Sequence, residues 1–250
     1  MGLTYMIKIK SGIYQSTLFF VPEIIHGFST KKFGDMRDTE KRKIFLSALG
    51  IEETSLVWQE QIHKDAIRII SQSDRGKIIH GVDGLAYKQL SDDISITLSV
   101  HTADCVPLLA LDPVTKVIGV AHAGWKGTIL HIGRTLIDQM KQLGSSVSDV
   151  RFVIGPHIGA CCYHVDDTRM QVFQREWGEN SGVVTHKDGK HYVDLGQANI
   201  DDFLFSGILE KNIDSDPSLC TYCNINDFYS FRKSGAPLAG EIMGVIGFRK

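Results

Sequence analysis

The chain has 250 residues, of which 43% are hydrophobic and 22% are charged, and its formal net charge is −2. These values are typical of a soluble globular protein, and they argue against a basic surface for nucleic acid or for an anionic membrane. No apolar run approaches the roughly 20 residues of a membrane span, and residues 1–15 lack the basic-then-apolar layout of a signal peptide. We therefore expect a cytoplasmic protein that acts on a small molecule.

Strands and helices are interspersed along the chain without regular alternation. Runs rich in β-branched residues and bounded by turn formers predict strands at 17–21, 66–70, 94–100, 106–111, 117–122, 150–155 and 241–248. Apolar residues at helical spacing predict helices at 38–50, 127–143, 166–177 and 196–211. Because no repeat or linker interrupts the pattern, residues 1–250 are expected to form a single domain. The expected fold class is α+β, a layered α/β/β/α sandwich with mixed β-sheets and helices on the outer faces.

One predicted hairpin carries a thiol and an imidazole. The turn at Asp112-Pro113 joins two strands, and antiparallel pairing across it would return His122 to the neighbourhood of Cys105. His63 could supply a third ligand. Two imidazoles and one thiolate with an open fourth position are the ligand set of a catalytic zinc, which lowers the pKa of its bound water. The same ligands can also take up copper, and a buried thiol beside a satisfied histidine is the structural alternative.

Eight short strings follow one another over nearly the whole chain. They are HGFST (26–30), WQEQIH (58–63), DGL (83–85), TADCVPLL (102–109), AHAGWKGT (121–128), GPHIG (155–159), CTYC (220–223) and YSFRK (229–233). In this order they resemble the laccase-domain family, the bacterial "polyphenol oxidase" proteins described as purine nucleoside phosphorylases. The resemblance implies a single layered domain with a zinc held by His63, Cys105 and His122.

The resemblance also implies two activities. One is phosphorolysis of adenosine, inosine, guanosine and methylthioadenosine to the base and ribose 1-phosphate, and the other is deamination of adenosine to inosine. Asp104 is a candidate for the proton-transfer group of the deamination. Arg232 is the first choice for phosphate, because a guanidinium grips phosphate in a bidentate way, and Ser29 and Thr30 could add hydroxyl contacts. The expected partners are purine nucleosides and phosphate, and the sequence leaves the oligomeric state open.

Two features depart from this interpretation. Residues 29–35 read STKKFGD where family members often read STRxGG, so lysines replace the arginine of that loop. The chain also holds Cys161-Cys162 and Cys220-x-x-Cys223. These four cysteines could form a zinc site, but adjacent cysteines are poor ligands for one metal, so we expect buried thiols instead.

Three other functions stay open. A copper oxidase of phenols would need clustered His-x-His pairs, which do not occur in the sequence. A cysteine hydrolase would use Cys105 as nucleophile and His122 as base. The last alternative is a non-enzymatic metal-binding or interaction module, which gains support only if no nucleoside is turned over. Secondary candidates are His101 and His157 for proton transfer, an anion site at the helix opened by Gly124 and Gly127, and four aromatic residues that could stack on a purine, namely Trp58, Trp125, Phe228 and Tyr229.

Overall fold

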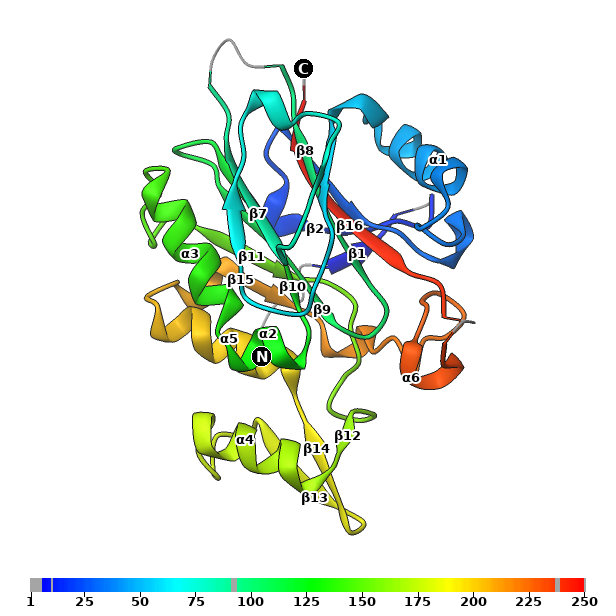
Figure 1. The fold of residues 1–250 in the computed structure, drawn as a ribbon, viewed down its shortest axis with the longest axis vertical. Coiled ribbons are helices and arrows are strands. Elements are labelled where there is room, and N and C mark those ends of the chain that lie inside the picture. Colours follow the sequence, from blue (N-terminus) through cyan, green and yellow to red (C-terminus); the bar gives the residue numbers. More distant parts are fainter. Residues whose placement is uncertain (1–5, 10, 91–93, 237–238, 250) are drawn as a thin grey trace.

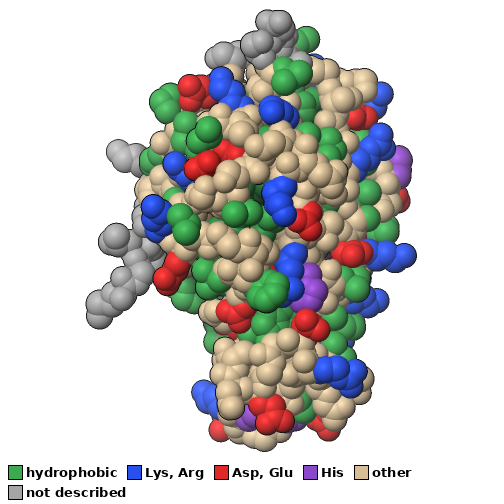
Figure 2. Space-filling view, turned by 90° about the vertical axis from the view of Figure 1, so that its left-hand side faces the viewer, with side chains coloured by type: hydrophobic (Ala, Val, Ile, Leu, Met, Phe, Trp, Pro, Cys, Tyr) green, Lys and Arg blue, Asp and Glu red, His purple; other side chains and the backbone are tan. Residues whose placement is uncertain are grey.

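The computed structural model describes residues 6–9, 11–90, 94–236 and 239–249. Residues 1–5, on which part of the signal-peptide prediction falls, lie outside the described residues. Within the described ranges, two large sheets face each other and helices cover their outer surfaces (Figure 1). No helix of the described chain is long and apolar enough to cross a membrane. The face drawn in Figure 2 carries scattered side chains of both charges, shown in blue and red.

The first sheet has the strand order β1-β2-β3-β16-β8-β4-β6 among the described residues. These strands are β1 (Met6–Lys8), β2 (Tyr14–Ser16), β3 (Ile24–Phe28), β4 (Leu56–Gln59), β6 (Ile78–Ile79), β8 (Thr97–Thr102) and β16 (Ile242–Phe248). The pair β16–β8 is antiparallel whereas β4–β8 is parallel, so this sheet is mixed.

The second sheet has the strand order β15-β11-β9-β10-β7-β5 in the described part of the chain. Its strands are β5 (Ile67–Ile69), β7 (Gly84–Lys88), β9 (Val106–Asp112), β10 (Val117–Ala123), β11 (Arg151–Ile154) and β15 (Ile213–Ser215). It is also mixed, because β10 pairs antiparallel with β9 and β11 pairs parallel with β15. The prediction of mixed sheets is thereby confirmed.

The helices complete the layers. They are α1 (Thr39–Leu49), α2 (Trp125–Ile129), α3 (Ile132–Gln142), α4 (Asp167–Trp177), α5 (Leu195–Phe205) and α6 (Phe231–Ser234). Helix α1 packs on the first sheet through Phe45 and Leu46, and α3 and α5 pack on the second sheet through residues such as Leu136 and Phe203. The expected α/β/β/α order of layers is confirmed.

Strand β9 explains the uninterrupted apolar run of the predicted hairpin. Leu108 and Ala110 belong to the core under α3 and α5, whereas Leu109 and Leu111 belong to the core between the two sheets. Because successive side chains of a strand point to opposite faces, a strand buried on both faces needs apolar residues at every position.

Several predicted elements differ from the observed ones. Segment 17–21 is a 3-10 turn over Thr17–Phe19 rather than a strand, because the Ser16 side chain accepts a hydrogen bond from the Leu18 N–H and begins a turn there. The predicted helix 127–143 is divided into α2 and α3, since His131 has a left-handed backbone with φ of 56°. The predicted helix 196–211 ends at Phe205.

A smaller unit lies below the two sheets in Figure 1. It contains α4, which was predicted from the sequence. It also contains a small sheet of β12 (His164–Val165), β14 (Lys190–Val193) and β13 (Val184–Lys187), which was not predicted. Phe173 of α4 and Val193 of β14 join the core under the second sheet. The unit therefore shares its hydrophobic core with the rest of the protein.

Candidate metal centre

The hairpin brings the predicted ligands together. The Asp112 carboxylate accepts hydrogen bonds from the backbone N–H groups of Val114 and Thr115, at 2.8 and 3.1 Å, and so closes the turn. The register of β9 and β10 then pairs His122 with Pro107, so that His122 returns to the level of Cys105. This part of the sequence-based geometry is confirmed.

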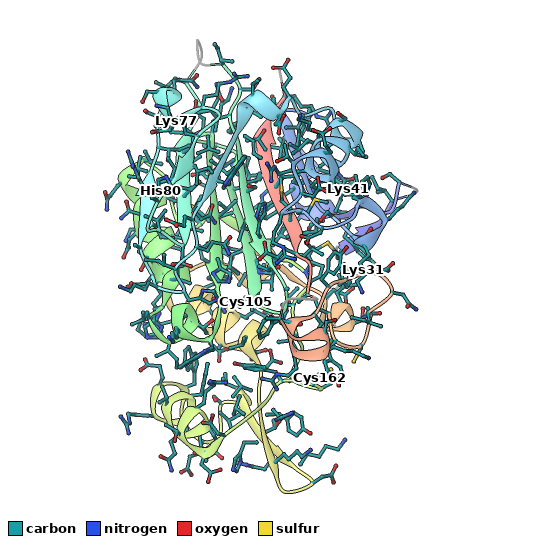
Figure 3. The ribbon with its side chains drawn as sticks, turned by 45° about the vertical axis from the view of Figure 1, so that its right-hand side comes forward. Lys31, Lys41, Lys77, His80, Cys105 and Cys162 are labelled. Atoms are coloured by element: carbon teal, nitrogen blue, oxygen red, sulfur yellow. The ribbon has the colours of Figure 1, made fainter. Side chains whose placement is uncertain are left out.

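Three ligand atoms meet at this end of the sheets. Cys105 lies directly before β9, His122 lies on β10, and His63 lies beyond the end of β4. One ring nitrogen of each histidine and the Sγ of Cys105 lie within 4.8 Å of one another. Figure 3 shows Cys105 toward the lower end of the strands.

A fourth residue, Asp83, holds two of these ligands in place. Its buried carboxylate lies 2.9 Å from Nδ1 of His122, and it accepts backbone N–H groups of His63 and Lys64 at 2.8 Å each. The hydrogen bonds fix the left-handed backbone of His63, whose φ is 57°. Since Nδ1 of His122 is engaged, Nε2 is the nitrogen left for a metal, as in the carboxylate–histidine pairs of metal sites. The string DGL contains Asp83, but sequence reasoning gave this residue no role.

The charges of Cys105 and His122 depend on each other. Burial by itself raises the pKa of the Cys105 thiol, but the His122 charge and hydrogen bonds from His122 and His63 outweigh it, so the pKa is lowered. Burial lowers the pKa of His122, whereas Cys105 and Asp83 raise it above its ordinary value. These shifts favour a deprotonated Cys105 sulfur, the form in which cysteine binds a metal cation.

Gly124 leaves room for these ligands. A Cβ atom at this position would lie 3.0 Å from Sγ of Cys105 and 3.4 Å from Cδ2 of His63. Helix α2, which follows it, has 5 residues. The role of Gly124 is thus to allow close packing of the ligands, and the structure gives no further support for an anion site at this turn.

A cavity of about 400 Å³ opens on the three ligands. Its other walls include Arg37, Gln61, His101, Phe231 and Glu241. The volume lies within the range of about 300–1,000 Å³ that is usual for small-molecule sites. The cavity therefore has space for a nucleoside-sized ligand.

His101 and Glu241 face each other in this cavity, with 3.8 Å between Nδ1 and Oε2. Burial lowers the pKa of His101 to about 4, so its ring is neutral at pH 7. Burial raises the pKa of Glu241, and the nearby Arg37 only partly opposes this effect. Glu241 is therefore easier to protonate than an ordinary carboxyl group.

Arg37 carries the positive charge on the cavity wall. Its Nη2 donates to Oδ2 of Asp35 at 2.6 Å and to the Ala239 carbonyl at 2.8 Å, which orients the guanidinium. Sequence reasoning missed Arg37 because it looked for an arginine inside the STRxGG-like loop, whereas this one lies just after it.

Asp104 and Arg232 lie outside the described lining of the cavity. The Asp104 carboxylate accepts hydrogen bonds from Thr221 Oγ1 and from the Arg232 backbone N–H, both at 2.6 Å. The Arg232 guanidinium donates to the His164 carbonyl at 2.8 Å. In this structure Asp104 joins two segments beside the site, and the Arg232 guanidinium is hydrogen-bonded to the backbone of β12.

Ser29 and Thr30 also use their hydroxyl groups elsewhere. Ser29 Oγ accepts the Met243 N–H at 2.9 Å, and Thr30 Oγ1 donates to the Gly12 carbonyl at 2.8 Å. Both side chains are buried. They brace the backbone behind the cavity and do not belong to its described lining.

Of the secondary candidates for proton transfer and purine stacking, one lines the cavity and the others do not belong to its described lining. His101 lines the cavity, whereas His157 binds the Gly155 carbonyl through Nδ1 at 2.8 Å. The described lining includes Phe231 but none of the four aromatic residues proposed for stacking, Trp58, Trp125, Phe228 and Tyr229. Trp58 and Trp125 instead lie 4.4 Å from the guanidinium carbons of Arg42 and Arg169.

A cavity with three metal-ligand side chains, one of them held by a buried carboxylate, is the arrangement of a metal-dependent enzyme. A family model described as "Multi-copper polyphenol oxidoreductase laccase" matches residues 31–249. The chain belongs to this laccase-domain family, as the resemblance of its sequence strings implied.

The curated relatives carry names from nucleoside chemistry. The chain is 31% identical to purine nucleoside phosphorylase YlmD of Bacillus subtilis strain 168, over 91% of this chain and 90% of that protein. It is 27% identical to adenosine deaminase RL5 of an unknown prokaryotic organism, over 84% and 82% of the two chains. The crystal structure of YlmD from Geobacillus stearothermophilus has a TM-score of 0.86 and 26% identity, and the match covers 99% of this chain and 100% of that one.

Proposed function

We propose that the protein is a zinc-dependent purine nucleoside phosphorylase that also deaminates adenosine. Its substrates would be adenosine, inosine, guanosine and methylthioadenosine, as the family resemblance implies. The observation that carries the proposal is the meeting of His63, Cys105 and His122 within 4.8 Å beside a nucleoside-sized cavity. The names of the relatives support the same chemistry. We also propose a cytoplasmic location, which five free thiols support.

The ligand set suits zinc. Two imidazoles, one thiolate and an open side toward the cavity match a catalytic zinc site, and Asp83 provides the usual support for a metal-bound histidine. A bound zinc would act as a Lewis acid and would supply hydroxide near neutral pH. Copper can occupy the same ligands, but the other group of close ligands among the described residues consists of four cysteines. Multicopper oxidation of phenols therefore has less support.

Phosphorolysis requires an anion site and a proton donor. Phosphate must be held beneath C1′ of the ribose while the bond to the base breaks, and Arg37 offers an oriented guanidinium for this purpose. The leaving purine needs a proton, and the carboxyl group of Glu241, with its raised pKa, is suited to donate it. In deamination the same carboxyl group would protonate the purine ring, take up a proton from the water that adds to C6, and pass that proton to the departing ammonia. Phe231 lies on the wall where a base could stack.

The test combines product analysis with metal analysis. Purified protein is incubated with adenosine in the presence and absence of phosphate, and the products are separated by chromatography. We expect adenine only with phosphate, inosine with or without it, and loss of both in Cys105→Ala and His63→Ala. His80→Ala is the matched control, because His80 is exposed like His63, and within the described residues its ring lies 3.1 Å from Glu60, away from the three ligands. Full zinc content and full activity in Cys105→Ala would refute the proposal.

A second candidate is a cysteine hydrolase. The Cys105 thiolate, the His122 imidazolium and the Asp83 carboxylate form a Cys–His–Asp series in space, which is the order of a nucleophile, a base and the group that orients the base. Such an enzyme would stay active after treatment with a chelator and would be inactivated by iodoacetamide. The zinc enzyme would lose activity with the chelator and regain it with added zinc.

A further inference from the structure

Four cysteines outside the cavity form a second cluster. Cys161 and Cys162 lie just before β12, and Cys220 and Cys223 lie in the turns that precede α6. The four Sγ atoms lie within 4.8 Å of one another. Cys161 and Cys223 are exposed, so the sequence-based expectation of buried thiols is wrong for these two residues. In Figure 3 the labelled Cys162 lies below Cys105, between the sheets and the smaller unit.

The sulfur spacing matches that of a tetrahedral metal site. Sγ of Cys223 lies 3.7 Å from Sγ of Cys161 and 3.4 Å from Sγ of Cys162. Zinc–sulfur bonds of about 2.3 Å place the corners of a tetrahedron about 3.8 Å apart, whereas the sulfurs of a disulfide are about 2.0 Å apart. Both adjacent cysteines therefore reach the same partner sulfur without bonding to it. This geometry weighs against the sequence-based objection that adjacent cysteines are poor ligands for one metal.

Backbone N–H groups hold the sulfur of Cys220 in place. Its Sγ accepts the Gly159 N–H at 3.3 Å, and it also accepts the backbone N–H of Cys223. Cys220 is buried, so it would form the inner corner of the cluster.

Two basic side chains, Arg232 and Lys233, lie near the cluster. Four thiolates around a divalent cation carry a net charge of −2, which needs compensation. Arg232 lines the same recess of about 290 Å³ as Cys161 and Cys162. Lys233 lies beside it, with Nζ 4.7 Å from the centre of the Tyr222 ring. Arg232 is not part of the described cavity lining, and a negatively charged metal–thiolate centre beside it would explain its position in this recess.

We propose that Cys161, Cys162, Cys220 and Cys223 bind a second metal ion, zinc or another thiophilic divalent cation, at a structural site. Four protein ligands leave no open position for a substrate, which is the mark of a structural rather than a catalytic zinc. The ion ties the segment leading into β12 to the segment leading into α6. Thr221 lies inside the Cys-x-x-Cys turn and bonds Asp104, the neighbour of Cys105, so the second site also steadies one side of the first.

The first measurement is the metal content of the purified holoprotein. We expect about two equivalents of zinc in the unaltered chain, and about one each in Cys105→Ala and in the double variant Cys161→Ser/Cys223→Ser. The matched control is His164→Ala. His164 borders the same recess without belonging to the group of close ligands, so this variant should keep both equivalents.

A spectroscopic measurement identifies the ligands. Cobalt is bound to the Cys105→Ala protein, whose first site is disabled, and the absorption spectrum is recorded. Tetrahedral thiolate ligation predicts sulfur-to-cobalt charge-transfer bands, and these should disappear when Cys223→Ser is added. This readout does not depend on enzymatic activity, so it separates failure of the second site from failure of the proposed function.

Two results would overturn the inference. One is an unchanged metal content in Cys161→Ser/Cys223→Ser relative to the unaltered chain. The other is a thiol count on denatured, unreduced protein that shows these cysteines paired as disulfides. If the double variant does not fold, the Cys105→Ala protein, whose other four cysteines are intact, is stripped by a chelator and titrated with zinc. Failure to bind about one equivalent at saturation would then contradict the second site.

Discussion

Nδ1 of His122 lies 2.9 Å from Oδ1 of Asp83, and the same carboxylate accepts the backbone N–H groups of His63 and Lys64. One buried acid therefore sets the ring of one ligand and the backbone of another. The relationship joins β10, the turn after β4 and the residue just before β7, which are distant in sequence. Asp83 is therefore a position at which the affinity for the proposed metal can be changed without replacing a ligand.

Replacement of Asp83 by Asn should weaken metal binding. The NH₂ group of asparagine donates hydrogen bonds and cannot accept them. In Asp83→Asn this NH₂ group would therefore face backbone N–H donors in place of an accepting oxygen. Loss of such supporting groups typically lowers metal affinity by about 10–100-fold. The measurement is a zinc competition titration against a chromophoric chelator.

Asp112→Asn is the matched control for this change. Asp112 is equally buried and also accepts two backbone N–H groups, but it closes the hairpin at the other end of β9. We expect lower stability with unchanged zinc affinity. Equal zinc affinities in the two variants would show that Asp83 has no special role at the metal.

Gly124→Ala should crowd the same site from the opposite direction. The new methyl group would lie 3.0 Å from Sγ of Cys105, so the ligands must shift. Overpacking typically costs about 1–3 kcal/mol, and we expect the zinc affinity to fall by about tenfold or more. Gly119→Ala on β10 is the control, because its methyl group would meet Leu136 at 2.8 Å in the core. Gly119→Ala should lower the temperature of thermal unfolding but leave the zinc titration unchanged, whereas Gly124→Ala should change the zinc titration.

Arg37→Gln should raise the KM for phosphate in phosphorolysis. Hydrogen bonds to a charged group contribute about 1.5–3 kcal/mol, so a rise of about 10–100-fold is expected. Deamination needs no phosphate and should change little. The comparison is Arg232→Gln, measured in the same assay. If this second variant were the one that lost affinity for phosphate, the sequence-based assignment of Arg232 would be right and the assignment of Arg37 wrong.

The hairpin and its two ligands could be predicted because the signal is local. A continuous apolar run, an Asp-Pro turn and antiparallel pairing together fix where His122 lies relative to Cys105. The layered arrangement follows from the same patterns, because strands buried on both faces must have helices outside them. The short strands of the smaller unit could not be predicted, since a two-residue strand such as β12 carries no periodicity.

The cavity walls were harder to predict for a different reason. Glu241 and Phe231 lie far along the chain from the metal ligands, and no local pattern separates them from ordinary surface residues. Asp104 and Arg232 have side chains suited to proton transfer and to phosphate binding, and each follows or precedes a residue of the cavity wall. In the folded protein, however, both side chains are hydrogen-bonded to groups outside the cavity. The four-cysteine cluster could not be predicted for the same reason, because its cysteines come from two turns that are distant in sequence and meet only in the folded chain.

His26 offers a pH test of the fold away from the metal. The side chain is buried on β3, and its Nε2 accepts the Ser16 N–H at 3.0 Å, so the ring is neutral. Burial lowers its pKa to about 4, and the charge of Arg249 acts in the same direction. The unfolded chain has an ordinary histidine pKa of about 6.5.

Because the unfolded state binds the proton more readily, acid favours unfolding through this residue. Its contribution is constant above about pH 6.5, and stability is lost as the pH falls from there toward 4, by about 3 kcal/mol at most. His101 and His157 also have lowered pKa values, so the informative quantity is the difference in acid loss between variants.

His26→Gln keeps an acceptor for the Ser16 N–H and removes the titration. Urea unfolding from pH 4 to 8 should therefore show a shallower acid loss in His26→Gln than in the unaltered chain, whereas the exposed-site control His80→Gln should leave the slope unchanged. Parallel pH profiles for His26→Gln and the unaltered chain would mean that the buried ring is already free to protonate in the folded state.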